Sequence, residues 1–107
     1  MRKIGTLETT SYGTCDVMLG RYQENGREAI ALVGTGNGNF QGEPIATLSV
    51  NLGSANLADG EFLAKTYSEN EGLAKDALKS PLFTDTGRRI PSGFVQLEVW
   101  TLNQEAK

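Results

Sequence analysis

The stretch that decides the fold runs from Cys15 to Val33 and reads CDVMLGRYQENGREAIALV. Its first half, Cys15–Gln23, alternates apolar and polar side chains with the period of two that is typical of a β-strand. The Asn25-Gly26 pair suits the positive backbone angles of a tight turn, and Glu28–Val33 supplies a second apolar run. The stretch therefore predicts a β-hairpin, and with it an antiparallel sheet.

Further strands are expected on both sides of this hairpin. Downstream, Pro44–Leu52 has the cleanest period-two pattern of the chain, which places one of its faces in the core. Glu61–Tyr67 is short and charged, as suits the edge of a sheet, and Phe94–Leu102 fits a long final strand. Upstream, Lys3–Thr9 fits an N-terminal edge strand. We expect a mostly antiparallel sheet of about five or six strands.

One helix is expected, at about residues 69–80. Ser68 and Glu71 fit the Ser-x-x-Glu capping box that often starts a helix, and Pro81 after Ser80 ends it. The segment 85–87, Asp-Thr-Gly, fits a turn before the final strand. The predicted fold class is α+β, as a single domain over residues 1–107 with one helix packed on the sheet.

The composition excludes several classes of function. The chain has 107 residues and a net charge of −3, which is too mild for a basic nucleic-acid binder. It contains no His and a single Cys, which removes the Ser-His-Asp triad and most soft-metal sites. No apolar run approaches the roughly 18 residues that cross a bilayer, and the N-terminus lacks the apolar core of a signal peptide. We expect a cytoplasmic protein without membrane or direct nucleic-acid contact.

Two motifs of the sequence are candidates for a chemical role. Cys15 lies beside Asp16, but the chain has no His to accept the thiol proton, so a buried strand residue is expected. The glycine-rich loop 34–42 follows an apolar strand, as a dinucleotide-binding loop does. However, Asn39 stands where the fingerprint needs its third glycine, and a strand follows where it needs a helix. We therefore expect no catalytic residue, no metal site and no cofactor.

Four stretches of the second half resemble a domain-of-unknown-function family of small bacterial proteins. They are ATLSVNL at 46–52, KTYSENEGL at 65–73, TGR at 86–88 and PSGFV at 91–95. Members of such a family occur on plasmids, integrating elements and phages. The resemblance therefore implies an accessory role in the maintenance or transfer of a mobile element, or in its conflict with host defence. It assigns no catalytic residue.

These inferences favour a non-enzymatic accessory protein of a phage or mobile element. It would bind a host or element-encoded protein, for example to inhibit a CRISPR effector or a restriction enzyme. The acids expected to contact that partner are Glu61, Glu69, Glu71, Asp76 and Asp85. The alternative is a small-molecule or nucleotide-binding module in which the 34–42 loop closes over its ligand. A homodimer would pair through a free edge strand or through the face expected to carry Phe94 and Trp100.

Overall fold

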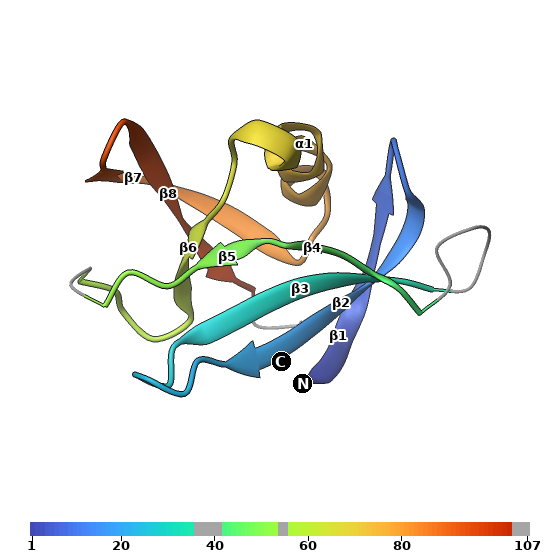
Figure 1. The fold of residues 1–107 in the computed structure, drawn as a ribbon, viewed down its shortest axis with the longest axis horizontal. Coiled ribbons are helices and arrows are strands. Elements are labelled where there is room, and N and C mark those ends of the chain that lie inside the picture. The colour runs from blue at the N-terminus through green and yellow to red at the C-terminus, as the bar shows by residue number, and fades with distance from the viewer. Residues whose placement is uncertain (36–41, 54–55, 104–107) are drawn as a thin grey trace.

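The computed structural model describes residues 1–35, 42–53 and 56–103. Within them, eight β-strands form two four-stranded antiparallel sheets, and one helical segment packs beside them (Figure 1). Sheet A has the strand order β1-β2-β3-β4, and sheet B has the order β5-β6-β8-β7. The fold is α+β and mostly antiparallel, as predicted, but it has two sheets where one was expected.

Sheet A is built around the predicted hairpin. This hairpin consists of β2 (Gly13–Arg21) and β3 (Glu28–Gly34), which pair antiparallel along their length. Gly26 in the connecting turn has a φ of +69°, an angle that glycine adopts without a steric penalty. The expected N-terminal strand is present as β1 (Arg2–Thr9) at the edge beside β2, and β4 (Pro44–Thr47) pairs with β3.

The strand predicted over 44–52 is divided between the two sheets. β4 ends immediately before Leu48, and β5 (Ser49–Val50) begins immediately after it. The Leu48 amide donates to the Ile30 carbonyl of β3 at 2.8 Å, and the Leu48 carbonyl accepts from the Lys65 amide at 2.8 Å. Leu48 thus connects sheet A to Lys65, in the segment that follows the strand 61–64 of sheet B.

This division explains the burial of the alternating apolar residues. Leu48 has no exposed surface and belongs to the cluster between the sheets. Val50 and Leu52 are only half-buried, and they pack in a second cluster on the other face of sheet B. The prediction of a single core face for 44–52 is therefore wrong, because the two halves of the stretch belong to different sheets.

The strand predicted as an edge over 61–67 is shorter and lies inside sheet B. β6 (Glu61–Ala64) pairs with β5 on one side and with β8 (Val95–Leu102) on the other. The last three residues of β6 are all buried. The edge prediction is wrong. The charged residues Glu61 and Lys65 lie on either side of a buried apolar segment, and they do not show that the strand itself is at an edge.

One strand was not predicted from the sequence. β7 (Phe83–Ser92) forms the edge of sheet B beside β8, and the segment 85–87 predicted as a turn lies within it. The pairing register shifts between Asp85 and Arg89, and Gly87 has a φ of +86° there. The turn signal therefore marks a β-bulge, in which glycine supplies the positive backbone angle.

The helical segment lies where it was predicted, at about residues 69–80, but it starts without a capping box. A 3-10 turn, η1 (Ser68–Asn70), precedes α1 (Glu71–Lys79), whose N-cap is Asn70. Asn70 makes no side-chain cap hydrogen bond, and its amide group donates instead to the Thr47 carbonyl of β4 at 2.9 Å. Ser68 has a φ of +58° and lies a full 3-10 turn before α1, so it does not cap that helix.

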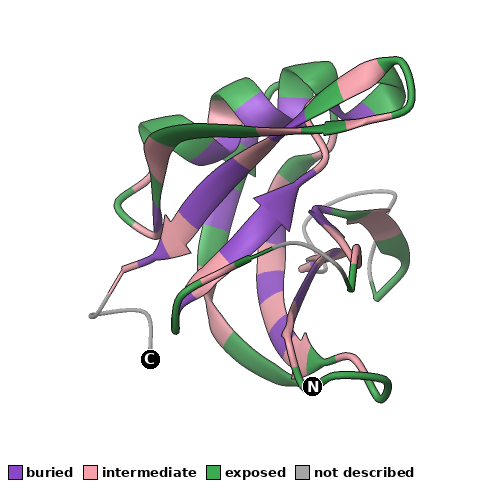
Figure 2. Cartoon of the chain, turned by 90° about the vertical axis from the view of Figure 1, so that its left-hand side faces the viewer, coloured by how far each residue is buried: buried purple, intermediate pink, exposed green. Residues whose placement is uncertain are grey.

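A single apolar cluster fills the space between the two sheets and α1, with its buried residues on the strands and on the inner side of the helix (Figure 2). Trp100 lies at its centre without exposed surface, and its ring meets that of Phe62 edge-on at 6.1 Å between centroids. Phe62 meets Phe83 in the same way at 5.6 Å. This cluster fixes sheet B, sheet A and α1 relative to one another.

The face expected to carry both Phe94 and Trp100 does not exist. Trp100 is fully buried, whereas Phe94 lies in the two-residue turn Gly93-Phe94 between β7 and β8 and is fully exposed. Side chains alternate between the two faces of a sheet only along a strand, so the rule does not apply to Phe94 in this turn. A dimer through a shared Phe94 and Trp100 face is therefore not available to this fold.

Candidate functional site

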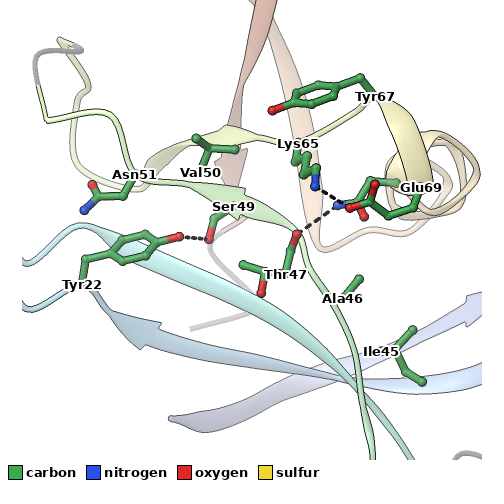
Figure 3. A pocket seen from close by; sticks show the side chains of 11 residues that line it. Tyr22, Ile45, Ala46, Thr47, Ser49, Val50, Asn51, Lys65, Tyr67 and Glu69 are labelled. Atoms are coloured by element: carbon green, nitrogen blue, oxygen red, sulfur yellow. Dashed lines mark hydrogen bonds and ion pairs between the residues drawn. The ribbon is translucent and has the colours of Figure 1, made fainter. Parts of the chain in front are cut away.

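A groove of about 440 Å³ lies where β4 passes into β5 (Figure 3). We call it the junction groove. Its polar and aromatic lining includes Tyr22, Thr47, Asn51, Lys65, Tyr67 and Glu69. The stretches 46–52 and 65–73, which carry two parts of the family resemblance, both contribute to this groove. The junction between the sheets thus creates a concave site from segments that are separate in the sequence.

One end of the junction groove presents hydrogen-bond donors. The hydroxyls of Tyr22 and Ser49 lie 2.9 Å apart, and the Ile30 amide donates to the Ser49 hydroxyl at 2.9 Å. Either hydroxyl can donate in this contact, and the Tyr22 hydroxyl lines the groove. Asn51 accepts from Asn25 through its side-chain oxygen, so its NH₂ group is also a donor at this end.

The other end of the groove holds an ion pair between Lys65 and Glu69 (Figure 3). The Lys65 ammonium also lies 5.6 Å from the centroid of the Tyr67 ring, within the range of a cation–π contact. The Lys65 side chain is 28% exposed and that of Glu69 is 64% exposed. The hydrogen bond from Lys65 lowers the pKa of Glu69 to about 2, and the same bond raises the pKa of Lys65.

The pKa of Glu69 gives a direct test of this pair. We expect a value near 2, and we expect Lys65→Gln to return it toward the ordinary value of 4.5, as followed by ¹³C NMR of the side-chain carboxyl during a pH titration. Because the folded-state pKa is depressed, the pair contributes stability above about pH 4.5 and loses it as the pH falls toward 2. Lys75→Gln, on the exposed side of α1, is the control and should leave the Glu69 pKa unchanged. A pKa above 4 in the unsubstituted protein would contradict the pairing.

A second candidate surface is the tip of the β7–β8 hairpin. Phe94 is 109% exposed there, and Ile90 and Val95 are partly exposed while packing on the outer cluster of sheet B. We call these three residues the hairpin-tip patch. Phe94 is the most exposed large apolar side chain of the described residues, so the hairpin tip is a candidate interaction surface.

Two of the predicted partner-binding acids lie on sheet B and are paired with arginines of β7. Glu61 binds Arg88 at 2.8 Å, and Asp85 binds Arg89 through both carboxylate oxygens at 2.9 and 3.0 Å. The hydrogen bond from Arg89 holds the pKa of Asp85 below its ordinary value. These acids contribute little net negative charge to their surface.

The other three predicted acids lie apart from Glu61 and Asp85. Glu69 and Glu71 lie at the start of the helical segment, and Glu69 is neutralised by Lys65. Asp76, on α1, accepts hydrogen bonds from the amide and the hydroxyl of Thr10 in the β1–β2 turn. Among the described residues, neither Glu71 nor Asp76 forms an ion pair. The five acids therefore lie in three places and do not form one continuous acidic face.

Of the residues that line the junction groove, only Glu69 was predicted from the sequence to contact a partner. Tyr22 and Ser49 are 27 positions apart, and only the division of the 44–52 stretch brings them together. No local motif signals such a site.

The other sites considered from the sequence add no chemistry. Cys15 is fully buried as expected, and burial raises the pKa of its thiol, which disfavours the reactive thiolate. Within residues 1–35, 42–53 and 56–103, no group of three or more His, Cys, Asp or Glu side chains could hold a metal ion. Most of the 34–42 loop, residues 36–41, lies outside the described residues.

Comparison with known proteins assigns no family to the chain. Neither a protein-family model, nor a curated protein, nor a solved structure matches it. In the part of the chain that the structure describes, no helix has the length and apolar character needed to cross a bilayer.

Proposed function

We propose that this protein acts by binding another protein through the hairpin-tip patch and not by catalysis. The observation that carries the proposal is Phe94, a fully exposed aromatic residue at the tip of a β-hairpin. Aromatic anchors contribute much of the affinity of protein interfaces, and burying a Phe side chain stabilises a complex by roughly 1.5–3 kcal/mol. The partner in this proposal offers an apolar pocket that receives the Phe94 ring.

The charges near the patch support a partner without strong charge of its own. Arg89, which precedes Ile90 of the patch, is paired with Asp85 and lies 3.8 Å from Glu98. An apolar centre with a polar rim is the usual composition of a protein interface. The arrangement thus favours surface complementarity over an acidic face that occupies a nucleic-acid groove.

The family resemblance gives the biological setting of this proposal. It implies an accessory protein of a phage or mobile element, and the partner that we propose is accordingly a host defence protein such as a CRISPR effector or a restriction enzyme. The first experiment is capture from a bacterial lysate that contains active defence systems, with the unsubstituted protein and Phe94→Ser as parallel baits.

Replacement of Phe94 tests this function directly. We expect Phe94→Ser to lower the affinity for the captured and purified partner by roughly 30-fold or more, because about 2 kcal/mol of anchor burial is lost. Biolayer interferometry measures the affinity. Leu78→Ser is the matched control, since Leu78 is the other exposed large apolar side chain of the described residues away from the N-terminus, and it lies on α1. Equal affinities of Phe94→Ser and the unsubstituted protein would overturn the proposal.

A further inference from the structure

We propose that the junction groove binds a mononucleotide, with its phosphate at Lys65 and its base directed toward Tyr22 and Asn51. This site is separate from the hairpin-tip patch and does not depend on the proposed protein partner. Its volume of about 440 Å³ falls within the range of small-molecule sites. Its lining combines aromatic rings with a few polar groups, as such sites do.

The hydrogen-bonding capacity of the groove calls for a ligand rich in acceptors. Asn51 retains its NH₂ group as a donor, because its side-chain oxygen accepts from Asn25, and the Tyr22 hydroxyl also lines the groove. Lys65 uses one of its three N–H donors on Glu69 and has two left. The donors at both ends of the groove thus face a space in which oxygen and ring-nitrogen acceptors would be bound.

The charge at Lys65 selects for an oxyanion at this end. A lysine ammonium is a common phosphate ligand in proteins, and here it is partly desolvated by its position beside the Tyr67 ring. Glu69 occupies the place that the phosphate would take. Because Glu69 is 64% exposed, it can turn into water, and an exposed ion pair of this kind contributes little to stability.

The aromatic residues select for a planar body attached to the oxyanion. Tyr22 and Tyr67 both line the groove, one near each end (Figure 3). Every nucleobase has a π-face that stacks on such a ring, and the Asn51 amide can donate to an acceptor at the edge of a base. A phosphate linked to a base through a ribose therefore satisfies both ends of the groove at once.

Titration of the ¹⁵N-labelled protein with AMP, followed by NMR, tests this site. We expect shifts confined to amides of the junction groove and a Kd below about 1 mM. Adenosine and inorganic phosphate are the two parallel probes. Each should bind at least roughly tenfold more weakly than AMP, because each engages only one end of the groove. No shift with AMP, or shifts outside the groove, would overturn the proposal.

Two substitutions with opposite expected effects separate recognition from a merely structural role. Lys65→Gln should weaken AMP binding at least roughly tenfold, because the cation is lost. Glu69→Gln should strengthen it by roughly threefold, because the competing carboxylate is removed. Lys79→Gln on the exposed surface of α1 is the control and should leave the affinity unchanged. Circular dichroism shows that each variant is folded. If Glu69→Gln weakened binding, or if Lys65→Gln left it unchanged, the phosphate site would be wrong.

Discussion

Trp100→Ala is expected to lower the free energy of unfolding by about 3–5 kcal/mol, which is the range for large aromatic residues removed from a core. Trp100 has no exposed surface, its ring contacts Phe62 and Phe83, and its indole N–H donates to Glu98 at 2.9 Å. Domains of this size are stabilised by only about 5–15 kcal/mol in total, so this loss removes a large share of the stability. Urea unfolding followed by circular dichroism measures the loss.

Phe94→Ala is the matched control for this measurement. The sequence pattern places Phe94 and Trp100 on one face of a strand, whereas the structure exposes one and buries the other. We therefore expect Phe94→Ala to change the free energy of unfolding by less than about 0.5 kcal/mol. Similar losses for the two variants would show that the β7–β8 hairpin is assembled differently.

Leu48→Ala is expected to cost about 2–5 kcal/mol of unfolding free energy. Leu48 is fully buried at the point where the chain passes from sheet A to sheet B, and its backbone is hydrogen-bonded on both sides. The neighbouring backbone can collapse little around the cavity, because both hydrogen bonds hold it in place. Thermal and urea unfolding of the same samples should report the same loss.

Leu52→Ala tests whether the division of this stretch is correct. Leu48 and Leu52 occupy equivalent apolar positions in the alternating pattern of this stretch. In the structure, however, Leu52 is only half-buried, in the cluster on the outer face of sheet B. We expect Leu52→Ala to cost about 1 kcal/mol, well below the loss for Leu48→Ala. Equal losses would favour one continuous strand with a single core face, and would contradict the junction.

The elements that sequence reasoning predicted correctly are those with local causes. The β2–β3 hairpin follows from two apolar runs around an Asn-Gly turn, and the end of the helix follows from Pro81 after Ser80. Each of these signals acts within a few residues along the chain. The fold class could therefore be predicted, although the number of sheets could not.

The remaining features depend on contacts between distant segments. β7 was missed because its bulge at Gly87 carries the residues of a turn, and because its arginines and Pro91 give it no alternating apolar pattern. The division at Leu48 depends on partners in β3 and after β6 that no local pattern reveals. The junction groove is a product of that division, and for this reason its lining residues other than Glu69 could not be assigned to a site from the sequence.

The junction at Leu48 also has a consequence for the folding kinetics of the chain. Leu48 is hydrogen-bonded both to β3 and to Lys65 after β6. Formation of sheet A therefore helps to position sheet B, and formation of sheet B helps to position sheet A. Sheet B further requires Glu61 to pair with Thr101, across a long intervening segment. Topologies dominated by such non-local pairing fold in milliseconds to seconds, which is much slower than helical bundles of equal size. The two sheets should therefore form in one slow cooperative step, with the same relaxation rate for probes placed in either.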